Sequence, residues 1–143
     1  MNGITTLQSG FPINVTIGRD IVNTGVGHQR PDLIVTPSTN CGSGQLTNCI
    51  TSPAYALPVP YNYGTAGRNM LYGPGLITFD ASLFKNIPIT ERWNFQFRAE
   101  FFNLFNTPAF SNPSSTFGTS SFGTVGSTKG NNRQIQFAGK IIF

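Results

Sequence analysis

Strict alternation of apolar and polar residues is the feature that most constrains this chain. From Trp93 to Phe101 the odd-numbered positions hold Trp, Phe, Phe, Ala and Phe, whereas the even-numbered positions hold Asn, Gln, Arg and Glu. From Ile135 to Phe143 the odd-numbered positions hold Ile, Phe, Gly, Ile and Phe. Because successive side chains of a β-strand point to opposite sides of a sheet, both segments are predicted to be strands with one apolar face.

Two further segments follow the same period less regularly, so that four strands are expected near residues 4–16, 76–87, 93–104 and 133–143. Gly10 and Pro12 weaken the middle of the first strand. The connections between strands are unequal. Residues 88–91 form a tight link, whereas the loops over 18–75 and 106–131 are long and rich in Gly, Pro, Ser, Thr and Asn.

This arrangement favours an all-β fold in which antiparallel strands form part of a transmembrane β-barrel with long extracellular loops. Soluble compact domains seldom contain such long connections, whereas outer-membrane barrels combine short periplasmic turns with longer external loops. Strands of about ten residues also suit a tilted membrane crossing. A soluble β-sandwich is the alternative, because alternation by itself does not distinguish lipid from a protein core.

Composition supports the membrane interpretation, since aromatic residues make up 13% of the chain and charged residues only 10%. In a barrel the apolar side chains face lipid and the polar ones line the lumen. We therefore expect the following residues to face lipid: Phe79, Phe95, Phe97, Phe101 and Phe137. We expect the polar set to be luminal: Asp80, Arg98 and Glu100.

The tight link also predicts a register for the hairpin around it. A turn centred near Ile89 would place Asp80 opposite Arg98 and Phe79 opposite Ala99, pairing opposite charges on one face and a large with a small side chain on the other. A competing register would set Asp80 against Glu100, where two like charges repel each other.

Other function classes find little support in the sequence. The nine basic residues are scattered, whereas a nucleic-acid surface usually shows clustered Lys and Arg. No nucleophile elbow, zinc-ligand spacing or phosphate-binding loop is visible, so neither an enzyme nor a bound metal or cofactor is expected. Asp80 and Glu100 could be read as paired catalytic carboxylates, but a luminal role explains them better. His28 is expected to be a solvated loop residue.

Cys41 and Cys49 lie in the first long loop with seven residues between them. An oxidising compartment would permit a disulfide that staples this loop. Two reduced thiols are the alternative. Metal binding would need further ligands, and the single histidine, His28, is remote in sequence.

Several stretches together resemble the C-terminal end of TonB-dependent outer-membrane receptors. In chain order they are GITTLQSGFPINVT (3–16), GRNMLYGPGLITFDASLFKNIPITER (67–92), FQFRAEFFNLFNTPAFSNP (95–113), FGTV (122–125) and RQIQFAGKIIF (133–143). The chain is most similar to the Oar-like group, whose members often carry a carboxypeptidase-regulatory-like domain. FRAEFFNLFN with its following Pro, and the last strand, are the most specific pieces.

The resemblance implies that residues 1–143 are a C-terminal fragment of a large plugged barrel in the outer membrane of a Gram-negative bacterium. The plug domain and the TonB box are absent from this stretch, so transport by it alone is not expected. Its partners would be outer-membrane lipid, the remainder of the barrel and plug, and TonB through the plug. The transported nutrient stays open. A soluble extracellular binding or adhesive module and a self-assembling β protein, which would use open sheet edges, are the alternatives.

The last strand resembles the C-terminal signal by which the barrel-assembly machinery recognises outer-membrane proteins. The pattern consists of an aromatic last residue preceded by alternating apolar positions, here Phe143, Ile141 and Phe137. Strand addition explains such recognition physically, since backbone pairing gives affinity and alternate side chains give specificity. The alternative is that Phe143 is one more ring facing lipid.

Overall fold

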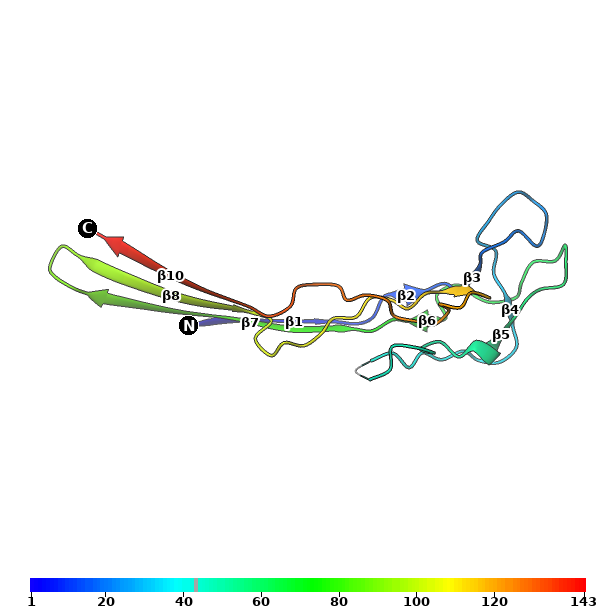
Figure 1. Ribbon diagram of the computed structural model, residues 1–143, viewed down its shortest axis with the longest axis horizontal. Helices are drawn as coiled ribbons and strands as arrows, with labels where there is room; N and C mark the ends of the chain where they lie inside the picture. Colours follow the sequence, from blue (N-terminus) through cyan, green and yellow to red (C-terminus); the bar gives the residue numbers. More distant parts are fainter. Residues whose placement is uncertain (43) are drawn as a thin grey trace. The chain divides into compact units, whose positions relative to one another are not determined.

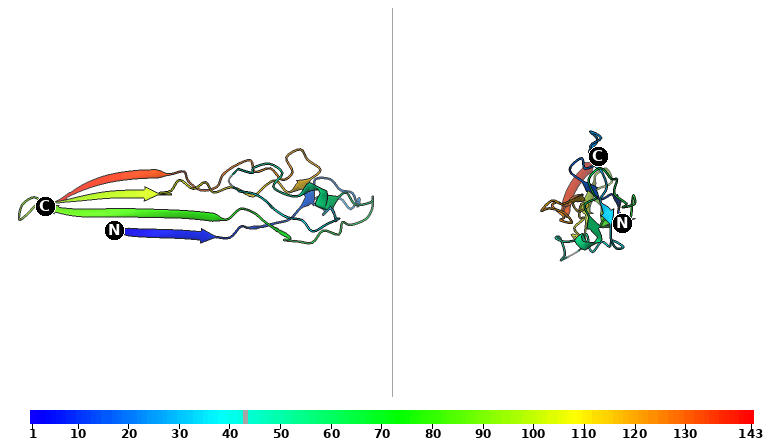
Figure 2. Two further views of the ribbon diagram at one scale, coloured as in Figure 1. Left: turned by 90° about the horizontal axis from the view of Figure 1, so that it is seen from below. Right: turned by 90° about the vertical axis from the view of Figure 1, so that its right-hand side faces the viewer.

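The computed structural model describes residues 1–42 and 44–143, and its longest elements are the strands of one antiparallel sheet. The strands are β1 (Asn2–Gln8), β7 (Leu76–Pro88), β8 (Asn94–Phe102) and β10 (Gln134–Ile142). They are arranged in the order β1-β7-β8-β10 (Figures 1 and 2). The predicted all-β class with antiparallel strands is confirmed, and the sheet is open, with β1 and β10 at its two edges.

The first predicted strand, 4–16, is wrong in length, because β1 ends at Gln8. The reason is a close approach between two glycines. A Cβ atom added to Gly10 would lie 1.7 Å from the carbonyl oxygen of Gly73, and the N–H of Gly73 donates to the carbonyl of Phe11 at 2.8 Å. The chain therefore leaves the sheet before this point. The other three strands lie close to the ranges predicted for them.

Between β1 and β7, and again between β8 and β10, the described residues form short strands of two residues each. β2 (Pro12–Ile13) pairs with β6 (Leu71–Tyr72), β3 (Thr16–Ile17) pairs in parallel with β9 (Thr116–Phe117), and β4 (Asp32–Leu33) pairs with β5 (Tyr55–Ala56), which follows the 3₁₀ turn η1 (Ser52–Ala54). No helix among the described residues is long and apolar enough to cross a membrane.

The chain divides into two compact units. The sheet unit comprises Met1–Gln8, Leu76–Ala109 and Lys129–Phe143, and the loop unit comprises Ser9–Gly75 and Phe110–Thr128. The loop unit thus contains most of the two segments that the sequence predicts as long loops.

The loop unit has a hydrophobic core of its own. Its buried residues are Ile13, Val15, Ile50, Ala54, Tyr55, Ala66 and Leu71. Three aromatic rings meet at this core. Tyr55 lies 6.0 Å from Phe117 and 6.1 Å from Phe122 between ring centroids, and the two phenylalanines are 5.4 Å apart. The long connections are therefore folded segments, although their composition is that of loops.

Candidate functional site

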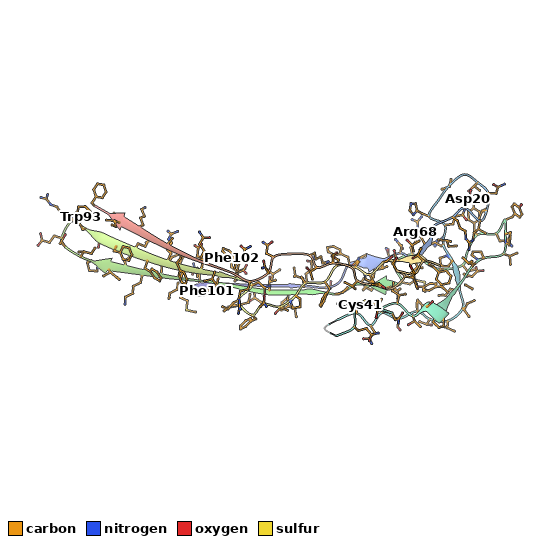
Figure 3. All side chains as sticks on the ribbon, viewed as in Figure 1. Asp20, Cys41, Arg68, Trp93, Phe101 and Phe102 are labelled. Atoms are coloured by element: carbon orange, nitrogen blue, oxygen red, sulfur yellow. The ribbon has the colours of Figure 1, made fainter. Side chains whose placement is uncertain are left out.

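Strand pairing divides the side chains of the sheet unit into two faces. β1 pairs with β7, β7 with β8 and β8 with β10 so that odd-numbered residues always lie opposite odd-numbered residues. The odd-numbered side chains form what we call the apolar face. Its large apolar members are Leu7, Ile77, Phe79, Leu83, Ile87, Phe95, Phe97, Phe101, Ile135, Phe137 and Ile141. Phe101 and Phe102, adjacent in sequence, leave β8 on opposite sides (Figure 3).

The apolar face is solvent-exposed over much of its area. Leu7 is 72% exposed, Phe137 65% and Ile77 60%. These fractions are high for large apolar side chains, and a contiguous exposed apolar patch of this kind marks a surface that contacts a partner or a membrane.

Phenylalanine rings cover the glycines of this face. A Cβ atom on Gly139 would lie 3.0 Å from the ring of Phe95 on the neighbouring strand, and one on Gly3 would lie 3.2 Å from the ring of Phe79. Phe97 and Phe137 stack with their centroids 6.1 Å apart. Aromatic side chains that lie over strand glycines stabilise a sheet where the glycine has no side chain to pack.

Lys85 and Phe84 are among the residues that interrupt the alternation. Lys85 belongs to the apolar face, opposite Phe97. On the other face, which we call the polar face, the aromatic Phe84 lies opposite Arg98, whose guanidinium carbon is 5.3 Å from the Phe84 ring centroid. A cation held over an aromatic face in this way gains electrostatic attraction from the ring. The contact with Arg98 therefore helps to stabilise the Phe84 ring on the polar face.

The predicted hairpin register is wrong. Phe84 lies opposite Arg98, Leu83 opposite Ala99 and Ser82 opposite Glu100. The predicted turn was placed too early. The N–H of Ile89 donates to the carbonyl of Trp93 at 2.9 Å, and the turn closes between Thr90 and Trp93. Neither predicted register occurs, although the assignment of odd-numbered residues to one face is unaffected.

Asp80 has a backbone partner in place of Arg98. Its carboxylate accepts a hydrogen bond from the N–H of Asn103 at 2.8 Å, just beyond the end of β8. Arg98 donates to the side-chain oxygen of Gln96 at 3.2 Å. The structure thus keeps Asp80, Arg98 and Glu100 on one face but does not bring Asp80 and Arg98 together as a cross-strand pair.

Asn103 is the centre of a hydrogen-bonded cluster that the sequence did not reveal, and we call this cluster the Asn103 clamp. Asn103 is only 6% exposed and has a left-handed backbone (φ 50°). Its side-chain amide donates to the carbonyls of Thr107 at 3.1 Å and Asn131 at 3.2 Å, and its side-chain oxygen accepts from the N–H of Thr107 at 3.0 Å. Together with the Asp80 contact, these bonds connect β7, the end of β8 and the residues just before β10.

The signal for this clamp is present in FNLFN. Asn adopts the left-handed conformation more readily than other residues with a side chain, and both Asn103 and Asn106 do so here. An Asn directly after an alternating strand therefore indicates a turn. Its two long-range partners, Asp80 and Asn131, become apparent only in the folded chain.

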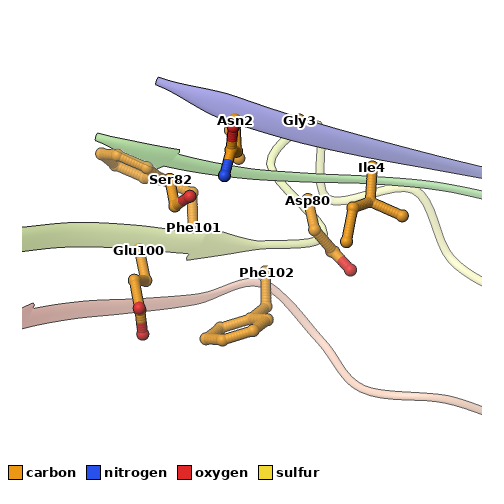
Figure 4. A pocket seen from close by; sticks show the side chains of 9 residues that line it. Asn2, Gly3, Ile4, Asp80, Ser82, Glu100, Phe101 and Phe102 are labelled. Atoms are coloured by element: carbon orange, nitrogen blue, oxygen red, sulfur yellow. The ribbon is translucent and has the colours of Figure 1, made fainter. Parts of the chain in front are cut away.

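A shallow cavity of about 250 Å³ lies over β1, β7 and β8 (Figure 4). Its lining includes two carboxylates, Asp80 and Glu100, beside Ser82, Ile4 and Phe102. Asp80 is held by the Asn103 clamp, and Glu100 lies opposite Ser82. Among the described residues no three His, Cys, Asp or Glu side chains group closely enough to hold a metal ion.

In the loop unit a polar cluster is centred on Asp20 and Gln29. The Asp20 carboxylate accepts from the N–H groups of Asn23 at 2.9 Å and Gly25 at 2.6 Å and from the amide of Gln29. Partial desolvation raises the pKa of Asp20, but these hydrogen bonds, led by that from Gly25, outweigh it and hold the pKa below its usual value. His28, in a left-handed conformation (φ 61°), is an exposed neighbour of this cluster.

Cys41 and Cys49, predicted as a possible disulfide, carry free thiols in the structure. Cys49 is buried, and its thiol donates to the carbonyl of Gln45 at 3.4 Å. Burial, and then the hydrogen bond and the charge of Cys49, raise the pKa of the Cys41 thiol to about 12.

Comparison with known proteins gives one result. A family model described as an outer membrane beta barrel domain matches residues 1–136, which is nearly the whole chain. No curated protein and no solved structure matches the chain significantly.

Replacing Asn103 with Ala should lower the free energy of unfolding by about 1–3 kcal/mol, because the change removes the three hydrogen bonds of the Asn103 side chain. Urea unfolding of the protein in detergent micelles measures the difference. Asn131→Ala is the matched control, since Asn131 contributes only its backbone carbonyl to the clamp. Equal stability of Asn103→Ala and the original protein would contradict a structural role for the clamp.

Proposed function

Since the chain belongs to the outer membrane β-barrel domain family, we propose that its four-stranded sheet is a segment of the barrel wall whose apolar face contacts lipid. In such barrels the lipid-facing and lumen-facing side chains alternate along each strand. The apolar face would carry Phe79, Phe95, Phe97, Phe101 and Phe137 into lipid. The polar face would present Asp80, Arg98 and Glu100 to the lumen.

The observation that carries this proposal is that an aromatic pair lies near each end of the sheet. At the turn end, Trp93 and Phe143 have centroids 5.4 Å apart (Trp93 is labelled in Figure 3). At the other end, Phe79 and Phe105 have centroids 5.5 Å apart. Transmembrane barrels carry aromatic girdles at both membrane interfaces, with an apolar band about 25 Å tall between them.

The spacing between the two pairs agrees with that height. Ile89, level with Trp93, follows Phe79 by ten residues along the same strand direction. At about 3.3 Å per residue this is about 33 Å along the strand, and a strand tilt of about 40° reduces it to about 25 Å across the membrane.

Lys85 lies on the apolar face opposite Phe97, near the middle of the face, so its charge must reach the polar interface by extension of the side chain. A lysine can place its four-carbon stem along apolar surface and its ammonium group toward the polar interface. The open edges of β1 and β10 require further strands on both sides, because unpaired backbone groups are not tolerated in hydrocarbon. This supports the remainder of a barrel as a partner of the sheet.

Phe97→Arg and Gln96→Arg form a matched pair that tests which face meets lipid. Phe97→Arg should destabilise the inserted protein by about 2–4 kcal/mol, the cost of a charge near the middle of the lipid face. Gln96→Arg, on the neighbouring position of the same strand, should be tolerated. The folded fraction in isolated outer membranes, measured by the heat-dependent shift in gel mobility, reports the difference.

Similar losses for both variants would indicate general disruption of the sheet. Loss of the folded protein with Gln96→Arg alone would mean that the polar face, and not the apolar face, contacts lipid.

We further propose that the barrel is that of a TonB-dependent receptor, related to the Oar-like group, which imports a nutrient across the outer membrane of a Gram-negative bacterium. The motifs that carry the resemblance support it. FRAEFFNLFN covers the later part of β8 and Asn103 itself, and GRNMLYGPGLITFDASLFKNIPITER spans β6, β7 and most of the turn. Energy would reach the barrel from TonB through the plug, which lies outside this sequence.

Growth on scarce nutrients tests the receptor proposal. A nutrient whose uptake is lost when the gene is disrupted should also fail to enter cells that lack TonB but retain the gene. The physical reason is that release of substrate through a plugged barrel needs energy that the outer membrane does not hold. Uptake that depends on this gene but proceeds normally without TonB would contradict the proposal and favour a passive channel.

We also propose that β10 and Phe143 are recognised by the barrel-assembly machinery. β10 is an edge strand, so its outer backbone groups are available for strand addition. Ile141, Phe137 and Ile135 share its apolar face and supply the alternate side chains that would give specificity.

Deleting Phe143 should reduce outer-membrane insertion about tenfold or more, since each 1.4 kcal/mol of lost recognition is a factor of ten. Leu7→Ala is the control, because it removes one exposed apolar side chain from the same face of β1. Quantitative immunoblots of membrane and periplasmic fractions report insertion. Equal insertion of both variants would mean that Phe143 contributes only lipid contact, in its pair with Trp93.

A further inference from the structure

Cys41 and Cys49 lie at the base of a hairpin in the loop unit. We call residues 41–49 the tip. Thr39 and Ile50 form an antiparallel bridge, the N–H of Asn40 donates to the carbonyl of Cys49 at 2.8 Å, and the N–H of Thr51 donates to the carbonyl of Ser38 at 3.3 Å. Beyond these bonds the chain continues directly into Cys41 on one side and from Cys49 on the other. The backbone thus brings the two residues together whatever the state of their thiols.

The tip between the cysteines holds two segments of the loop unit together. The N–H of Cys49 donates to the carbonyl of Gly123 at 2.8 Å, and the carbonyl of Leu46 accepts from the N–H of Val125 at 2.7 Å. Gly123 has a left-handed backbone (φ 71°), and a Cβ atom there would lie 3.0 Å from the backbone nitrogen of Ile50. The position of the tip therefore decides whether the 110–128 segment can dock on it.

We propose that Cys41 and Cys49 are joined by a disulfide in the mature protein, and that this bond holds the tip in place for docking of the 110–128 segment. The inference rests on membership of an outer-membrane family and not on the receptor function. Both sides of the outer membrane lie outside the cytoplasm, in compartments where disulfides form and persist. The proposal therefore holds whichever side of the membrane the loop unit faces.

The bond forms by exchange with an oxidised dithiol protein of the periplasm. The thiolate of one cysteine attacks the disulfide of that protein, giving a mixed disulfide, and the second thiolate then displaces the reduced protein. One S–S bond forms in the chain and one is lost in the partner, which receives two electrons, while the two thiol protons are released to the partner thiols and solvent. No other oxidant is required.

The order of events follows from the environment of the thiols. Cys49 is 1% exposed in the folded loop unit. Burial also raises the pKa of the Cys41 thiol to about 12. Because an external oxidant cannot reach the sulfur of a buried Cys49, we expect oxidation to precede closure of the loop unit.

Labelling of the protein isolated from outer membranes and unfolded in denaturant tests the bond. A maleimide polymer that adds mass to each free thiol should label no cysteine before reduction and both after reduction. Cys41→Ser is the control, because its remaining Cys49 thiol should be labelled without reduction. Labelling of both cysteines before reduction would overturn the proposal.

Proteolysis tests the role assigned to the bond. Leu46 is 41% exposed at the tip, so a protease that cleaves after large apolar residues can report opening of this segment. The double variant Cys41→Ser/Cys49→Ser should be cleaved there about tenfold faster or more than the original protein, since small closed loops restrict the open ensemble. Equal cleavage rates would show that the bond, even if present, does not hold the tip.

Discussion

Antiparallel backbone pairing that always matches odd-numbered with odd-numbered residues is the constraint on which the sheet unit depends. Each of the three pairings preserves this parity, so that most of the large apolar residues of the four strands share one surface. A slip by a single residue at any of them would send the apolar set of one strand to the polar face. The large shift from the predicted hairpin register, by contrast, leaves both faces intact because it moves the pairing by an even number of positions.

The Asn103 clamp connects this pairing to the turns beyond it. A strand end that leaves the sheet has backbone donors and acceptors without ladder partners, and such groups are costly when buried. Asn103 resolves this with one side chain and one backbone N–H, which bond Thr107, Asn131 and Asp80. Alternation places the Asp80 carboxylate on the polar face. There it accepts a hydrogen bond from the backbone N–H of Asn103 and so stabilises the turn after β8.

The loop unit follows different physics from the sheet unit. Its strands have only two residues each, and its stability comes from a small core with three aromatic rings and from close glycine contacts. Gly10 permits its backbone to approach that of Gly73 where a side chain would collide. A segment of this kind can be long and rich in Gly, Pro, Ser and Thr and still be ordered, which is why composition alone predicted loops.

Alternation and aromatic content in the sequence by themselves determined the strand class, the positions of the three later strands and the division into two faces. These features depend on local period and side-chain type. Membership of an outer-membrane barrel family was shown by the match to the family model. Only the tertiary structure decided the end of β1, the hairpin register, the Asn103 clamp and the core of the loop unit. Each of these depends on contacts between residues far apart in the chain, such as Gly10 with Gly73 and Asn103 with Asn131. Local preference cannot specify such contacts, since their free energy exists only when both partners are in place.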